Sequence, residues 1–209
     1  MIRWDLVTVG HLSRNRYWGE SEERPLRETC CTSTLIRTDD RTILVDPSRP
    51  AGRMTTALDE RTGLRPDAVD TVFITHRHGD HWVGIETFPD AQWLMAESEL
   101  ASWRASTEGA ERRIADRVQA APETLAPGVE LLSTPGHTDG LTSLAFHSGG
   151  SRVLVTGDAV MTADFFQHRD VYFNSVDRAE AVRSVERIAD AADIVVPGHD
   201  NYFRTAAAR

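Results

Sequence analysis

The chain has 209 residues, of which 40% are hydrophobic and 26% are charged, a balance that is ordinary for globular proteins. This length predicts a single domain, residues 1–209, with enough residues to bury a substantial core. The formal net charge of −9 disfavours non-specific binding to nucleic acid, because an acidic surface repels phosphate backbones.

The cationic residues and the cysteines exclude several kinds of chemistry. All 23 of the Lys and Arg residues are Arg, so a Schiff-base lysine and a P-loop lysine are both excluded. Cys30 and Cys31 are neighbours, and such pairs rarely form a disulfide because the bridge is strained. They match no zinc-binding spacing, so we expect two thiols at the start of a buried strand.

The first ten residues do not resemble a signal peptide. They include Arg3 and Asp5 and lack a long apolar stretch. No later segment approaches the roughly 20 apolar residues of a membrane span. We therefore expect a cytoplasmic protein without a membrane partner.

The first half of the chain is expected to alternate strands and helices. Apolar runs rich in β-branched residues predict strands at residues 4–9, 34–37, 42–45, 71–75 and 92–95. Between and after them, helical composition predicts helices at residues 53–61 and 98–106. Residues 13–28 are charged and turn-rich, and they predict a long loop that is either functional or a solvated connector.

The second half continues in the same way. A helix is expected at residues 111–120, followed by strands at 129–132, 141–146, 152–156 and 193–196. The clearest helix is 178–191, where apolar residues recur at helical spacing and Asp177 is a candidate N-cap. Helices among strands with short hairpin-like turns predict helices packed outside mixed β-sheets.

Four potential metal ligands lie within six residues directly after the strand 71–75. They are His76, His78, Asp80 and His81. Imidazole and carboxylate groups are the usual ligands of zinc, and they also suit manganese and iron. Such a cluster at a strand end predicts a metal site.

Three further strands each lead through a glycine to one more ligand. These ligands are His137, Asp158 and His199. A glycine allows a sharp turn and a close approach to a metal, and ligands at matching strand ends converge above a sheet. The other histidines, His11, His147 and His168, lack this context and are expected to be structural.

The pattern His-x-His-x-Asp-His, followed in order by a histidine, an aspartate and a histidine, resembles the metallo-β-lactamase superfamily. The resemblance spans residues 34–199 and implies an αββα sandwich of two mixed sheets flanked by helices. It implies that His76, His78 and His137 hold one metal, that Asp80, His81 and His199 hold a second, and that Asp158 bridges both. By the same resemblance, Asp46 orients a ligand histidine.

This resemblance implies two Zn²⁺ ions, with Mn²⁺ or Fe²⁺ as alternatives, and hydrolysis by a hydroxide that bridges them. Asp80 and Asp158 are then the catalytic carboxylates. The best-known β-lactamases of the family carry a cysteine where this chain has Asp158, which argues against a β-lactam substrate. The compact members that remain include acyl-homoserine-lactone lactonases, although these often carry a tyrosine at the position of Met161.

The preferred function is therefore hydrolysis of a carboxylic ester, lactone or thioester of a small molecule. A phosphodiesterase or nuclease and a mononuclear iron enzyme such as a persulfide dioxygenase remain open alternatives, as does a homodimer. Aromatic residues of two segments, 13–28 and 161–174, are expected to line the substrate pocket. The named candidates are Tyr17, Trp18, Phe165 and Tyr172, and Tyr172 or Tyr202 is a candidate source of a hydroxyl group.

Overall fold

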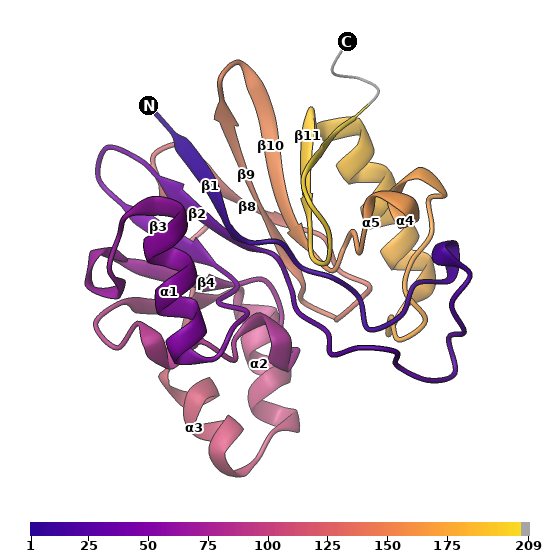
Figure 1. Ribbon diagram of the computed structural model, residues 1–209, viewed down its shortest axis with the longest axis horizontal. Coiled ribbons are helices and arrows are strands. Elements are labelled where there is room, and N and C mark those ends of the chain that lie inside the picture. Colours follow the sequence, from indigo (N-terminus) through magenta and orange to yellow (C-terminus); the bar gives the residue numbers. More distant parts are fainter. Residues whose placement is uncertain (206–209) are drawn as a thin grey trace.

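Strands from the first half of the chain form one sheet whose order follows the sequence (Figure 1). The computed structural model describes residues 1–205. The strands of this first sheet are β1 (Arg3–Thr8), β2 (Ser33–Arg37), β3 (Thr42–Val45), β4 (Thr71–Ile74), β5 (Gln92–Met95) and β6 (Gln119–Ala120). The pairs from β1 to β3 are antiparallel and those from β3 to β6 are parallel, so the sheet is mixed.

The second half of the chain forms an equivalent six-stranded sheet. Its strands are β7 (Thr124–Ala126), β8 (Val129–Ser133), β9 (Thr142–Ser148), β10 (Ser151–Gly157), β11 (Ile194–Pro197) and β12 (Phe203–Arg204). Only β10 and β11 are parallel here, and the other neighbours are antiparallel.

The longer helices lie outside the pair of sheets (Figure 1). They are α1 (Ala51–Thr62), α2 (Glu97–Ser106) and α3 (Gly109–Arg117) beside the first sheet, and α5 (Arg178–Ala191) beside the second. A short helix, α4 (Ala163–Gln167), and single 3-10 turns at Arg16–Trp18, Pro66–Ala68, Gly79–His81 and Ile85–Thr87 complete the list. This arrangement confirms the predicted αββα sandwich.

Side-chain alternation along the strands explains the layers. In β4, Phe73 packs between the sheets, whereas Val72 and Ile74 pack outward beneath the helices of the first sheet. In β10, Val153 packs inward and Leu154 packs outward against α5. Both faces of these strands are therefore buried, which is why their sequences are continuous apolar runs.

The structure corrects the predicted elements mainly at short segments. The helix expected at 111–120 ends at Arg117, and β6 occupies its last two positions. Strands β6, β7 and β12 have only two or three residues, too few to show alternation in the sequence, and α4 is one short turn. The helix α5 begins as expected, because the Asp177 side chain accepts a hydrogen bond from the Glu180 amide.

The structure also describes the cysteine pair and the apolar character of the helices. Cys30 and Cys31 are buried free thiols just before β2, as predicted. Within residues 1–205, no helix combines the length and the apolar character needed to cross a membrane.

We expect Phe73→Ala to lower the free energy of unfolding by about 3–5 kcal/mol, since it leaves a cavity between the sheets. Phe73 is fully buried there. Urea denaturation measures the loss. Val176→Ala, at a side chain that is 55% exposed, serves as the control and should change stability by at most about 0.5 kcal/mol. Equal losses in the two variants would contradict this description of the core.

Candidate metal centre

The seven predicted ligands lie at strand ends that meet at one edge of the sandwich. In the second sheet, β8 and β10 are both antiparallel to β9, and β11 is parallel to β10, so these three strands run in one direction. Their carboxyl ends lead to His137, Asp158 and His199, and the end of β4 in the first sheet leads to His76. The topology of each sheet therefore brings ligands distant in sequence to the same place.

A close backbone approach seats His199 beside Asp158. A Cβ built on Gly198 would lie only 2.1 Å from Asp158 Oδ1, so no side chain fits at that position. This explains the glycine before His199: it lets the end of β11 pass directly against the carboxylate.

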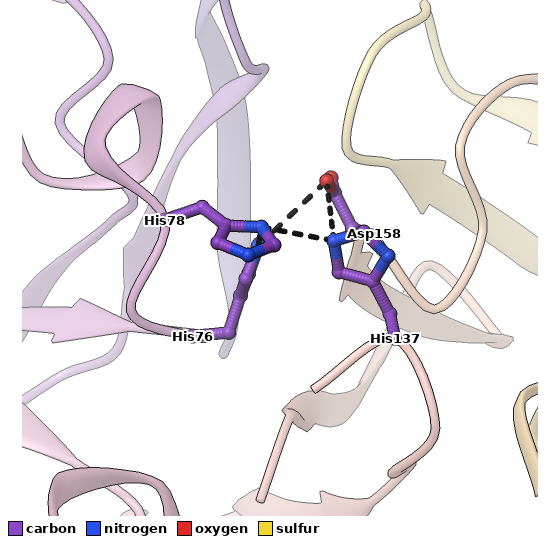
Figure 2. Close-up of side chains that lie close together, drawn as sticks. All are labelled: His76, His78, His137 and Asp158. Carbon is purple, nitrogen blue, oxygen red and sulfur yellow. Dashed lines mark hydrogen bonds and ion pairs between the residues drawn. The ribbon is translucent and has the colours of Figure 1, made fainter. Parts of the chain in front are cut away.

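One group of side chains, the first group, contains His76, His78, His137 and Asp158 (Figure 2). His78 Nδ1 lies 3.0 Å from His76 Nε2 and 3.0 Å from His137 Nε2. Asp158 Oδ2 is 3.3 Å from His137 Nε2 and 3.7 Å from His76 Nε2. A tetrahedral zinc ion keeps ligand nitrogens roughly 3.3 Å apart, given bonds of about 2.0–2.1 Å, so the spacing suits a metal.

A second group contains Asp80, His81 and His199. Here Asp158 contributes its other oxygen, because Oδ1 lies 3.1 Å from His81 Nε2 and 3.1 Å from His199 Nε2. His199 Nε2 is also 3.6 Å from Asp80 Oδ2. The Asp158 carboxylate thus presents one oxygen mainly to each group.

Hydrogen bonds behind the second group fix which nitrogen of each ring faces Asp158. Asp46 Oδ2 lies 2.8 Å from His81 Nδ1, and the Cys30 carbonyl lies 3.0 Å from His199 Nδ1. Since both acceptors call for a proton on Nδ1, Nε2 is the nitrogen of each ring that faces Asp158 and remains available as a metal ligand.

Asp46 is itself held in an uncommon backbone conformation. Its φ is +52°, a left-handed value that aspartate and asparagine tolerate better than most residues. Its carboxylate accepts hydrogen bonds of 2.8 Å from both the amide and the hydroxyl of Thr75, next to His76. One carboxylate therefore ties β3 to the start of the ligand loop and to His81.

Burial controls the protonation of the first group. It lowers the pKa of His137 to about 3, and it lowers the pKa of His76 well below its ordinary value, with His81 adding to that effect. Burial opposes ionisation of Asp158, but His199 and His81 hold the pKa of this carboxyl well below its usual range. Neutral imidazoles and an ionised carboxylate are the forms that bind metals.

Unpaired buried atoms test whether a metal would fit. Among the residues that the structure describes, His81 Nε2 and Asp158 Oδ1 are buried and have no hydrogen-bond partner, although they lie 3.1 Å apart. Leaving such atoms unpaired is costly, and a shared cation would satisfy both. The donor set of imidazole nitrogens and carboxylate oxygens fits a pair of divalent cations.

Cys31 also lies close to Asp46 and His81. His81 already uses Nδ1 for Asp46, and burial raises the pKa of the Cys31 thiol far above its ordinary value, which disfavours the thiolate. This cluster therefore resembles packing behind the site more than a third metal position.

A cavity of about 230 Å³ opens over both groups. Its lining is Leu12, Ser13, Thr29, His78, Asp80, Asp158, Met161, Tyr172, Phe173, Asn174 and His199. A larger cavity of about 410 Å³ lies between α3 and residues 82–86, but its lining contains no histidine. Because its lining contains the candidate metal ligands, the smaller cavity is the candidate substrate site.

Of the four predicted pocket residues, only Tyr172 lines the cavity; Tyr17, Trp18 and Phe165 do not. The Tyr17 hydroxyl donates to Asp170 at 2.5 Å, and Trp18 Nε1 donates to Asp164 at 2.9 Å. These side chains hold the 13–28 loop against the segment that follows Asp158. The predicted loop therefore supports the wall and contributes only Ser13 to it.

The other tyrosine considered, Tyr202, is 48% exposed and stacks edge-on against Trp4, so it is not part of the cavity. Leu12 and Thr29, which also line the cavity, carry no signal in the sequence. Thr29 Oγ1 lies 3.3 Å from Asp80 Oδ2, yet the sequence around it contains no motif. Only the fold shows that the two residues flanking the 13–28 loop border the ligands.

Comparison with known proteins identifies the family. The family model described as the metallo-beta-lactamase superfamily matches residues 27–199. The chain belongs to this superfamily. The match covers every residue of both groups.

The matches to individual relatives cover only part of each relative's length. An N-acyl homoserine lactonase from a Bacillus species is 30% identical over 68% of this chain and 60% of the relative. Metallo-beta-lactamase domain-containing protein 1 of Homo sapiens is 34% identical over 78% of this chain and 59% of that protein. The chain thus spans about 60% of the length of these relatives.

A solved structure shows the same fold. AidC, a dizinc quorum-quenching lactonase in complex with a product, superposes with a TM-score of 0.69 at 20% sequence identity. The superposition covers 81% of this chain and 72% of that one.

We expect Asp46→Asn to weaken zinc binding about 10–100-fold, the usual effect of losing an outer partner of a metal ligand. Asparagine keeps the φ of +52° accessible, but its amide must face a donor from Thr75 or His81. Competition with a chromophoric zinc chelator measures the affinity. An unchanged affinity in a folded variant would show that Asp46 does not orient His81.

Proposed function

We propose that this chain is a metal-dependent hydrolase that cleaves a carboxylic ester, lactone or thioester of a small molecule. The observation that supports this most is the Asp158 carboxylate, which presents one oxygen to each of two groups of histidines. Two-metal sites of this kind serve hydrolysis because both ions act on one substrate.

The ligand assignment follows from the two groups. The first ion would be held by His76, His78 and His137 and the second by Asp80, His81 and His199, and Asp158 would serve both. We propose zinc as the metal, in keeping with the nitrogen-rich donor set and with the dizinc lactonase of the same fold. Mn²⁺ and Fe²⁺ are the alternatives, since both accept the same ligand types.

When bound, such a pair of ions polarises a carbonyl oxygen and lowers the pKa of water toward neutrality. Asp80 is the most exposed of the carboxylates here, with 21% of its side chain accessible, and it borders the cavity. We assign it the transfer of the proton from the attacking water toward the leaving oxygen. Asp158, with only 6% of its side chain accessible, serves as a fixed ligand.

The cavity wall supports the substrate class. Leu12, Met161 and Phe173 give it apolar surface, and Tyr172, whose hydroxyl donates to the Arg14 carbonyl, also lines it. At about 230 Å³ the cavity is below the usual range for drug-sized ligands, so a small acyl or lactone group fits best. The Bacillus relative is named as a lactonase, which favours a lactone.

Several expectations stay predictions. These are a single domain over residues 1–209, a cytoplasmic location and a homodimer. A nucleic-acid substrate remains disfavoured by the net charge of −9, and a single-iron redox reaction by the presence of two complete groups of donors.

We expect zinc-loaded protein to release acid from N-acyl homoserine lactones at constant pH. Asp158→Ala should lower the rate by at least about 10²–10³-fold, the scale of losing one group that stabilises the transition state. Titration in a pH-stat, with thioesters and simple esters in the same panel, measures the rate and ranks the substrates.

Asp193→Ala is the matched control, because Asp193 directly precedes β11, at the end of this strand opposite to His199. Its carboxylate accepts a hydrogen bond from the Arg152 amide. The control should keep its rate. Absence of acid release from every substrate by protein that holds two zinc ions would overturn the proposed reaction and would favour a phosphodiester substrate.

We also expect Asp170→Ala to raise KM about 3–10-fold while zinc content stays constant. Asp170 accepts hydrogen bonds from Tyr17 and Arg178 and forms an ion pair with Arg16, so its loss frees the loop behind the wall. The expected change corresponds to about 1 kcal/mol, because 1.4 kcal/mol is tenfold.

Steady-state kinetics with the best substrate measures this change. Asp116→Ala removes an exposed ion pair with Arg112 on α3 and should leave KM unaltered. If the two variants behave alike, the 13–28 loop does not shape the substrate site.

A further inference from the structure

Glu99 is a buried acidic residue that has no part in the proposed reaction. Within residues 1–205, three acidic residues are buried, and the other two, Asp46 and Asp158, belong to the metal centre. The Glu99 side chain has no accessible surface. A buried carboxylate is costly unless charged or hydrogen-bonding partners surround it, so its contacts carry information.

Those contacts join the two ligand loops of the first group. Glu99 Oε1 accepts a hydrogen bond of 3.0 Å from the Arg77 amide and forms an ion pair of 3.0 Å with the Arg77 guanidinium. Glu99 Oε2 accepts a hydrogen bond of 2.9 Å from the Gly140 amide. Arg77 stands between His76 and His78, and Gly140 follows His137 by three residues.

The backbone around Glu99 leaves little room for movement. A Cβ built on Gly140 would lie 2.3 Å from the Glu99 amide nitrogen, so the loop after His137 rests directly on the first turn of α2. The helix α2 lies beside the first sheet, whereas the loop after His137 connects β8 and β9 of the second sheet (Figure 1). Glu99 therefore connects the two halves of the sandwich immediately behind the first group.

We propose that Glu99 is a positioning residue that sets the distance between the His76–His78 loop and the His137 loop, and thereby the metal affinity of the first group. Two of its ligand nitrogens come from one loop and one from the other, and both spacings to His78 Nδ1 are 3.0 Å. Metal coordination tolerates errors of only about 0.2 Å, so a shift between the loops weakens binding.

This inference rests on the proposed metal-dependent function. Glu99→Gln keeps the shape of the side chain but places an amide group against Arg77 or against the Gly140 N–H. We expect one of the two zinc ions to bind about 10–100-fold more weakly, as for other outer partners of metal ligands, while the second keeps its affinity. Titration of the apoprotein with zinc against a chromophoric chelator separates the two affinities.

A general structural role is distinguished by a matched control. Asp193→Asn alters a carboxylate that accepts a backbone amide hydrogen bond of 2.7 Å away from the ligand loops. We expect it to lower the melting temperature of the apoprotein without altering either zinc affinity. If Glu99→Gln does not fold, Arg77→Gln is tested in its place. The loss of the guanidinium contact should lower the affinity for one of the two zinc ions about 3–10-fold.

Two results are decisive in the other direction. Folded Glu99→Gln that binds both zinc ions with wild-type affinity would overturn the positioning role, and so would equal losses at both ions in Glu99→Gln and Asp193→Asn. Failure of the wild-type protein to bind zinc would instead contradict the proposed function itself.

Discussion

Contacts of the Asp158 carboxylate with imidazoles from both sheets organise this molecule. Its two oxygens lie 3.1–3.3 Å from nitrogens of His81, His137 and His199. One of these histidines follows a strand of the first sheet and two follow strands of the second. The relative placement of the sheets therefore determines whether the centre forms, and the apolar layer around Phe73 and Val155 maintains that placement.

Burying the metal centre costs free energy of folding, and hydrogen bonds from the surrounding structure offset part of it. Buried imidazoles and a buried carboxylate lose hydration, and the closest nitrogens repel if more than one is protonated. Asp46, the Cys30 carbonyl and Glu99 supply acceptors that hold rings or loops in place before any ion arrives. Such preorganisation limits the rearrangement that metal binding requires, and it places part of the function in residues that touch no substrate.

Much of the fold could be predicted from the sequence because its physical signals are local. Apolar runs such as residues 71–75 and the Asp177 cap mark strands and a helix without reference to the rest of the chain. The ligands were recognisable because four of them cluster directly after one strand and each of the other three follows a glycine. Tyr17 and Trp18 could not be placed in this way, since their partners Asp170 and Asp164 lie about 150 residues later. The role of Glu99 could not be predicted for another reason: a glutamate on a helix normally faces solvent, and here Arg77 and Gly140, from two distant loops, lie against it.

The most direct test is a crystal structure of the zinc-loaded protein with diffraction data collected on both sides of the zinc absorption edge. We expect two anomalous peaks about 3.5–4 Å apart, one among His76, His78 and His137 and the other among Asp80, His81 and His199, with Asp158 between them. A single peak, or peaks away from Asp158, would contradict a two-metal centre and with it the proposed hydrolysis.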